Sequence, residues 1–303
     1  MFSIITPTYN RAHTLDRVYT SLQKQTDQDF DWIIMDDAST DDTEKLVKSW
    51  IAQSNPFSIQ YHKLIENKGK PNALNQGFKH CVRPITIIAD SDDTFVPHTL
   101  VELRMLWNTV DLSKDAHKIA AIWTLTDDEN GNLVGEEFPH NFWQVNFKER
   151  VLKPKKPIAG EKWHSWRTEV LKKYKMFQSE HNTYVPESGT WKRINQDYDF
   201  LCINIIHRKY FSSPDGIIQK KRKRLEWETR KYYSAYYQLY NTSCSLILTH
   251  PFFRRYAFEY LKARFYHKDD GAKLDFKRIL CCIVPALLNI PKGIIGYIRS
   301  HSK

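Results

Sequence analysis

Short apolar runs alternate with amphipathic segments through the first 125 residues of the chain. Runs rich in β-branched and aromatic residues favour strands, and apolar positions three and four residues apart favour helices. The pattern predicts strands at Phe2–Thr6, Trp32–Met35, Ser58–Leu64, Pro84–Ala89 and Lys118–Thr126. It predicts helices that begin near Thr14 and Asp42, and helices over Asn72–His80 and Val96–Val110.

Strands that alternate with helices in this way predict an α/β fold, with a mostly parallel sheet flanked by helices. The alternation stops after Val134. We interpret residues 135–200, which mix aromatic, basic and proline-containing stretches, as functional loops laid over the sheet edge. From Lys220 onward the chain is predicted to be helical, basic and rich in tyrosine. We therefore expect one domain over residues 1–215, divided near residue 125, and a basic helical extension over residues 216–303.

Charge differs between the two halves of the chain. Residues 1–150 hold 15 Lys and Arg against 22 Asp and Glu, and the remaining residues hold 30 basic and 13 acidic side chains. An acidic surface favours metal ions, and a basic surface favours phosphate or anionic lipid headgroups. The run Lys220–Arg224 is five consecutive cations, for which a solvated helix face and a linker are equally simple explanations.

The cysteines and the ends of the chain indicate a cytoplasmic protein. There are five cysteines, an odd number, and the neighbours Cys281 and Cys282 are badly placed for a disulfide, so a reducing compartment is expected. The N-terminus begins with a strand pattern rather than a signal peptide. No apolar run reaches the roughly 18 residues that a membrane span needs. Ile279–Ile298 is apolar with flanking cations, which favours a helix lying on an anionic membrane, against the alternative of a helix docked on the core.

Polar residues follow three of the predicted strands directly. They are the segments Thr6–Arg11, Asp36–Thr43 and Asp90–Asp93. Ligands of open α/β sheets bind beyond the carboxyl ends of the strands, so the three segments are expected to meet at one crevice. No Gly-x-Gly-x-x-Gly fingerprint or Walker phosphate loop is present in the sequence.

The carboxylates of these segments suggest a cation site. Alternation places Asp90 and Asp92 on one side, where they can share a divalent ion, Mn or Mg. The alternative is a helix N-cap formed by Asp93 or Thr94. Asp37 can accept a hydrogen bond from a nucleotide base, and the alternative here is a turn capped by Ser39 or Thr40. Lys70 and Asn72 can add cationic and polar contacts.

The ordered set Ser3–Arg11, Asp36–Thr43 and Asp90–Asp93 resembles family 2 glycosyltransferases, which have the GT-A fold, and especially bacterial enzymes of cell-surface polysaccharide synthesis. The resemblance implies that a nucleotide-sugar, usually a UDP-sugar, binds residues 1–125 and that the acceptor binds residues 126–215. It implies donor contacts from Pro7, Thr8, Tyr9, Asn10, Arg11, Asp37, Lys70, Asn72, Asp90 and Ser91. Asp90 and Asp92 resemble the Asp-x-Asp signature, with Asp92 as the principal metal ligand.

The resemblance also bears on the acceptor half. Gly160–Arg167 followed by Val185-Pro186-Glu187 is similar to a subgroup with a Gly/Trp/Arg segment before a Val-Pro-Glu motif, which implies that Glu187 is the general base. The Glu-Asp pair of many family members is absent, so Asp197 remains an alternative base and a helix cap remains an alternative role for Glu187. Trp163 and Trp166 can stack on a sugar, with Arg167 beside them, or can pack in the core.

These features together predict a metal-dependent sugar transfer to a saccharide or lipid-linked saccharide, and the resemblance implies that the transfer is inverting. The enzyme would be cytoplasmic, or peripheral on the inner face of the cell membrane. A nucleotidyltransferase of similar fold is an alternative, although Thr6–Arg11 lacks the glycine-rich loop of that class. A second alternative is a non-catalytic membrane scaffold that binds nucleotide-sugars. A nucleic-acid partner is not expected, because no nucleic-acid module accompanies the basic run.

Overall fold

The computed structural model describes residues 1–153, 158–178, 186–212, 224–264, 272–285 and 287. Two compact units make up the chain. Unit 1 comprises Met1–Met176 with Thr190–Lys220, and unit 2 comprises Phe177–Gly189 with Lys221–Lys303. Most of the run Lys220–Arg224, and residues 288–298 of the expected membrane helix, lie outside the described residues.

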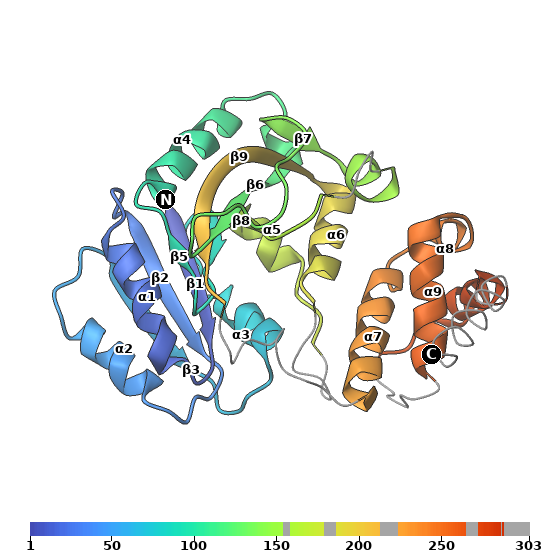
Figure 1. The fold of residues 1–303 in the computed structure, drawn as a ribbon, viewed down its shortest axis with the longest axis horizontal. Coiled ribbons are helices and arrows are strands. Elements are labelled where there is room, and N and C mark those ends of the chain that lie inside the picture. The colour runs from blue at the N-terminus through green and yellow to red at the C-terminus, as the bar shows by residue number, and fades with distance from the viewer. Residues whose placement is uncertain (154–157, 179–185, 213–223, 265–271, 286, 288–303) are drawn as a thin grey trace. The chain divides into compact units, whose positions relative to one another are not determined.

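The centre of unit 1 is a mixed sheet, in which the described residues contribute nine strands (Figure 1). Its order is β3-β2-β1-β4-β8-β6-β9-β5, and β7 pairs with β9. The strands are β1 (Phe2–Thr8), β2 (Phe30–Asp36), β3 (Ser58–Lys63), β4 (Ile85–Ile88), β5 (Thr94–Phe95), β6 (Ile119–Asp128), β7 (Trp143–Val145), β8 (Lys162–Arg167) and β9 (Asp199–Tyr210).

Helices cover both faces of this sheet (Figure 1). Side chains of α1, α2 and α4 pack on one face, and side chains of α3, α5 and α6 pack on the other. Along β1, Phe2 and Ile4 join the first cluster while Ile5 joins the second, because successive strand side chains point to opposite faces. The helices are α1 (Ala12–Gln23), α2 (Thr43–Ile51), α3 (Lys70–Gly77), α4 (Thr99–Asp111), α5 (Thr168–Lys173) and α6 (Ser188–Asp197).

The predicted α/β fold is confirmed, and the first four strands lie where the apolar runs predicted them. β1 pairs in parallel with β2 and β4, and β2 pairs in parallel with β3. Every residue of β1 and β2 is buried, as expected for central strands covered on both faces. The carboxyl ends of β1, β2 and β4 therefore meet at the same edge of the sheet.

The interpretation of residues 135–200 as loops over the sheet edge is wrong for much of the segment, which contains β7, β8, α5 and α6. The largest departure is β8, an antiparallel strand inserted between β4 and β6. Its polar residues mask its strand character, yet they are satisfied internally. Trp107 Nε1 donates to Ser165 Oγ at 2.9 Å, and Trp166 Nε1 donates to His164 Nδ1 at 2.7 Å. The twelve-residue strand β9 was also not predicted.

The described part of unit 2 is helical. It contains α7 (Arg224–Leu239), α8 (Cys244–Thr249), α9 (Pro251–Arg264) and a helical run over residues 276–285. Tyrosines join α7 to α9, since the rings of Tyr232 and Tyr260 stack with centroids 5.1 Å apart. Within the ranges that the structure describes, no helix is both long and apolar enough to cross a membrane. All five cysteines are free thiols.

Candidate functional site

The loops that follow β1 and β2 are joined by hydrogen bonds. The Asn10 amide donates to Ser39 Oγ at 2.9 Å, and Asn10 Oδ1 accepts from the Thr40 amide at 2.8 Å. Asn10 and Ala38 hold φ angles of 52° and 66°, a left-handed conformation that is uncommon for residues other than glycine. Strained backbone of this kind persists only where its surroundings fix it, so the two loops form one preorganised edge.

Asp37 lies on this edge but turns toward the loop after β3. Its two carboxylate oxygens accept the Lys68 amide at 3.1 Å and the Gly69 amide at 2.6 Å. Gly69 has φ 88°, which favours glycine at the start of α3. Burial raises the pKa of Asp37, although the two amides oppose that shift. In this structure Asp37 is buried and supports the loop that carries Lys70.

The loop after β4 carries the expected carboxylate cluster. Lys70 Nζ and Asp90 Oδ1 form an ion pair at 2.5 Å, which joins the start of α3 to this loop. Burial would raise the pKa of Asp90, but the charges of Lys70 and Arg208 outweigh it and hold the pKa below its usual range. For Asp92, burial and then the charge of Asp90 raise the pKa. The loop thus holds Asp90, whose negative charge is compensated, beside Asp92, whose negative charge is poorly compensated.

Arg208 is a site residue that the sequence reasoning missed. It lies on β9, is almost fully buried, and its guanidinium reaches Asp93 at 3.2 Å, Glu161 at 3.4 Å and Asp90 at 3.8 Å. Burial raises the pKa of Asp93 to about 7 against the opposing charge of Arg208. The sequence offers no clear signal for this role, because Arg208 stands between His207 and Lys209 at the polar end of a mostly apolar run.

The residues of the first three loops match a known family. A family model described as glycosyl transferase family 2 matches residues 3–113, which contain all three loops. Residues 3–113 are thus similar to glycosyl transferase family 2. The chain is 29% identical to an uncharacterized glycosyltransferase of Nostoc sp. over 54% of this chain, and 29% identical to the glycosyltransferase GlyG of Streptococcus pneumoniae over 46%. These alignments cover 56% and 45% of the two relatives, so the chain spans about half their length.

Solved structures establish the GT-A fold of this chain. The crystal structure of TarS from Staphylococcus aureus superposes with a TM-score of 0.58 at 18% identity, over 87% of this chain and 43% of TarS. The mannosyltransferase PcManGT of Pyrobaculum calidifontis, in complex with GDP-Man and Mn²⁺, superposes with a TM-score of 0.53 at 17% identity, over 95% of this chain and 80% of that one.

The remaining predicted donor residues lie at the same sheet edge. Pro7 and Thr8 are the last residues of β1, followed by the exposed Tyr9 and by Arg11. Asn72 is buried in the first turn of α3. Ser91 is buried, and its carbonyl accepts the Thr14 hydroxyl at 2.9 Å, which attaches the carboxylate loop to α1.

Two histidines beside the carboxylates have structural partners. His207 Nε2 lies 2.9 Å from Glu102 Oε2, which directs the ring toward α4. Burial lowers the pKa of His164 to about 3, so its neutral ring accepts the Trp166 hydrogen bond. Across the described residues, no group of three His, Cys, Asp or Glu side chains stands ready to hold a metal ion.

The predicted acceptor residues are part of the core. Trp163 is 2% exposed and Trp166 is 0% exposed, and the Trp166 ring stacks on Trp191 with centroids 4.3 Å apart. Arg167 donates to Asp111 Oδ1 at 2.6 Å and to the Ile119 carbonyl at 2.9 Å. Stacking on a sugar needs an exposed ring face, so in this structure the two tryptophans follow the packing alternative.

The two candidate bases lie in different units. Glu187 is half-buried in unit 2, directly before α6, and Tyr184 and Val185 of its motif lie outside the described residues. Asp197 ends α6 in unit 1, where it is exposed and accepts the Tyr174 hydroxyl.

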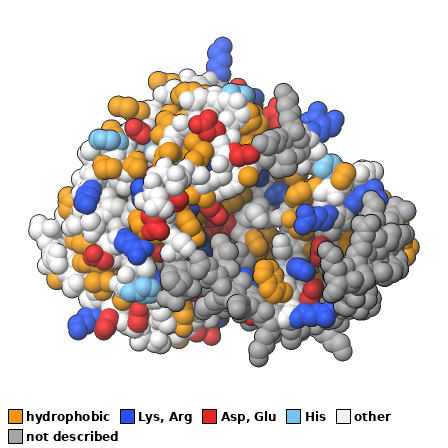
Figure 2. All heavy atoms as spheres, viewed as in Figure 1, with side chains coloured by type: hydrophobic (Ala, Val, Ile, Leu, Met, Phe, Trp, Pro, Cys, Tyr) orange, Lys and Arg blue, Asp and Glu red, His pale blue; other side chains and the backbone are white. Residues whose placement is uncertain are grey.

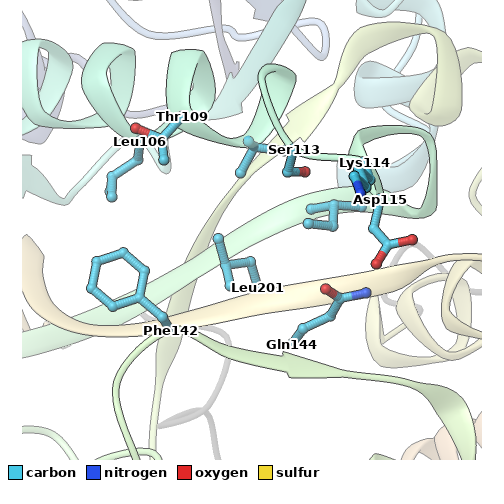
Figure 3. Close-up of a pocket in the computed structure, with 10 residues that line it drawn as sticks. Leu106, Thr109, Ser113, Lys114, Asp115, Phe142, Gln144 and Leu201 are labelled. Atoms are coloured by element: carbon cyan, nitrogen blue, oxygen red, sulfur yellow. The ribbon is translucent and has the colours of Figure 1, made fainter.

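A shallow cavity lies at the opposite edge of unit 1, far along β6 from the carboxylates. Its volume is about 230 Å³, and Figure 3 shows Leu106 and Thr109 of α4, with Ser113 just after the helix, facing Phe142, Gln144 and Leu201. Pockets for small ligands usually exceed about 300 Å³ and contain convergent polar groups. This cavity therefore carries no functional assignment.

On the face in Figure 2, acidic and basic side chains of unit 1 lie interspersed.

Proposed function

We propose that the protein transfers a sugar from a UDP-sugar to an acceptor hydroxyl, with inversion at the anomeric carbon and with a divalent metal. One observation carries the proposal. The loops after β1, β2 and β4 meet at one sheet edge, where Asp90 forms an ion pair with Lys70 and lies beside the poorly compensated Asp92. Residues 3–113 match the family there, and TarS has been solved with UDP-GlcNAc and PcManGT with GDP-Man.

The donor-side residues fit a divalent metal. No described side chain forms a hydrogen bond or ion pair with the Asp92 carboxylate. Mg²⁺ commonly binds proteins through one or two carboxylates, together with waters and substrate phosphates, so Asp92 with help from Asp90 is a suitable donor set. The bound ion would offset the negative charge that develops on the leaving diphosphate.

The chain's own residues would then divide the remaining work. The edge formed by Pro7–Arg11 with Ser39 and Thr40 would hold the nucleotide, and Asp37 would keep the Lys68–Lys70 segment in place. Lys70 would bring a cation to the diphosphate side of the site. Glu187 would accept the proton of the attacking hydroxyl, a role that rests on the Val-Pro-Glu motif.

Calorimetric titration with UDP and with GDP, each with and without Mn²⁺, tests the proposed function. We expect UDP to bind at least tenfold more tightly with Mn²⁺ than without it, and more tightly than GDP. Tighter binding of GDP would mean that the donor carries guanosine rather than uridine, and the proposed sugar transfer would still stand. Absence of binding by either nucleotide under all four conditions would contradict the proposal.

We further propose that the enzyme works on an anionic membrane surface, where a lipid-linked saccharide would be the acceptor. The helical run over residues 276–285 and its continuation at Leu287 expose an apolar stripe at helical spacing, formed by Phe276, Leu280, Ile283, Val284 and Leu287. The exposed Lys273 and Lys277 border this stripe. Apolar side chains beside cations suit the boundary of an anionic leaflet.

Vesicle flotation tests the membrane assignment. We expect wild type to float with phosphatidylglycerol vesicles and much less with phosphatidylcholine vesicles, and we expect Leu280→Asp with Val284→Asp to abolish flotation. Ile65→Asp with Leu112→Asp is the matched control, since it adds the same charge to two exposed apolar residues of unit 1. Equal flotation of the two double variants would argue against membrane binding by the stripe. A concentration-dependent dimer that is lost only in Leu280→Asp with Val284→Asp would identify a second copy of the chain as the partner of the stripe.

A further inference from the structure

Arg208 is a buried and heavily engaged cation of unit 1, and the proposed transfer does not yet give it a role. Its Nε donates to Thr126 Oγ1 at 3.2 Å across the β6–β9 pairing. One terminal nitrogen reaches Asp93 at 3.2 Å and Asp90 at 3.8 Å, and the other reaches Glu161 at 3.4 Å. A guanidinium can make such contacts together because its donors form a rigid planar fork.

These contacts determine which carboxylates remain available. Asp93 is 2% exposed, and its second oxygen accepts the Phe211 amide at 3.4 Å, so both of its oxygens are engaged with the end of β9. The oxygens of Asp90 are divided between Lys70 and Arg208. Asp92 is thus the member of the cluster with no hydrogen bond or ion pair to a described side chain, and only the nearby charges of Arg11 and Lys70 act on it.

We infer that Arg208 is a positioning residue of the donor site. It neutralises and orients Asp90 and Asp93 so that the loop can keep its carboxylates together and present Asp92 to the metal–diphosphate group. Without Arg208, the carboxylates of residues 90, 92 and 93 would repel one another, with Lys70 and Arg11 as the remaining compensating charges. The carboxylates of the loop would then move apart, and Asp92 would leave the position from which it binds the metal.

The inference rests on the proposed function, and its test separates the two. Mn²⁺ affinity in the presence of UDP is measured by the EPR signal of free Mn²⁺, for wild type, Arg208→Met and Arg208→Lys. We expect Arg208→Met to weaken Mn²⁺ binding by about 10- to 100-fold, as is usual when a group that orients a metal ligand is removed. Arg208→Lys should recover part of the loss, because an ammonium keeps the charge but cannot contact every partner at once.

Arg104→Met is the matched control. Arg104 also joins two carboxylates, Asp27 at 2.5 Å and Asp29 at 3.1 Å, but at a distant surface of unit 1. We expect this variant to lose stability without losing Mn²⁺ affinity. If wild type binds Mn²⁺ and UDP and Arg208→Met binds them equally well, the positioning role is wrong while the proposed function stands.

Two further outcomes are informative. If wild type itself binds neither ligand, the proposed function fails and the role of Arg208 fails with it. If Arg208→Met does not fold, Arg208→Lys decides: affinity equal to wild type overturns the inference, and an intermediate loss that Arg104→Lys does not show supports it.

Discussion

Asp92→Asn is expected to remove the metal-dependent part of UDP binding and to lower the transfer rate by about 10²- to 10³-fold, the usual loss when one preorganised electrostatic contact is deleted. The substitution keeps the shape of the side chain but removes the charge that would bind a cation. Burial and the neighbouring Asp90 already raise the pKa of Asp92, so the carboxylate is unfavourable there unless a cation is present. Calorimetry with and without Mn²⁺, together with the turnover rate, measures both effects.

Two comparisons make this result specific. Asp16→Asn removes an exposed carboxylate of α1 in the same unit and should change neither quantity. Asp90→Asn should weaken UDP binding in the presence and in the absence of Mn²⁺, because Asp90 is paired with Lys70. If Asp92→Asn retains full metal dependence while Asp90→Asn loses it, the metal ligand has been assigned to the wrong carboxylate.

Glu187→Gln is expected to lower kcat by about 10²- to 10⁴-fold with little change in donor KM, because a general base acts on the acceptor proton and does not hold the nucleotide. Asp197→Asn separates the two candidates. Asp197 already accepts the Tyr174 hydroxyl, and burial raises the pKa of that tyrosine, as expected for a structural hydrogen bond. Initial rates at varied donor and acceptor concentrations give the required comparison.

Glu169→Gln is the control for these two variants, since Glu169 is an exposed residue of α5 whose only described ion pair is with Lys172. A loss in Asp197→Asn without a loss in Glu187→Gln would transfer the base to the end of α6. Equal small losses in all three variants would exclude both acids from proton transfer.

The sequence predicted the parallel part of the fold because local patterns are sufficient there. β1 and β2 are buried on both faces and therefore appear as continuous apolar runs, and the polar segments after them mark the binding edge. β8 was missed because its residues Lys-Trp-His-Ser-Trp-Arg resemble a polar loop until their partners Trp107 and Ile119 are known. Those partners lie far away in the sequence.

Contacts between residues far apart in the sequence also limited the prediction of the site. Asp90, Asp92 and Lys70 could be named from local spacing, and the structure brings Lys70 and Asp90 together. Arg208 could not, since its contacts depend on β9 returning to the carboxylate loop, where the Phe211 amide meets Asp93 across 118 positions of sequence. Trp163 and Trp166 were assigned to the acceptor because aromatic composition alone does not distinguish a buried ring from an exposed one.

The position of β8 has a consequence for how the protein can be divided. The segment that matches the family ends at residue 113, while the strand that pairs with the free side of β4 begins at Lys162. A fragment containing only the matched segment would leave the backbone amides and carbonyls of β4 open to other chains, which is the condition that promotes edge-to-edge aggregation. The matched segment is therefore not a separable module, because only the later strands close its sheet.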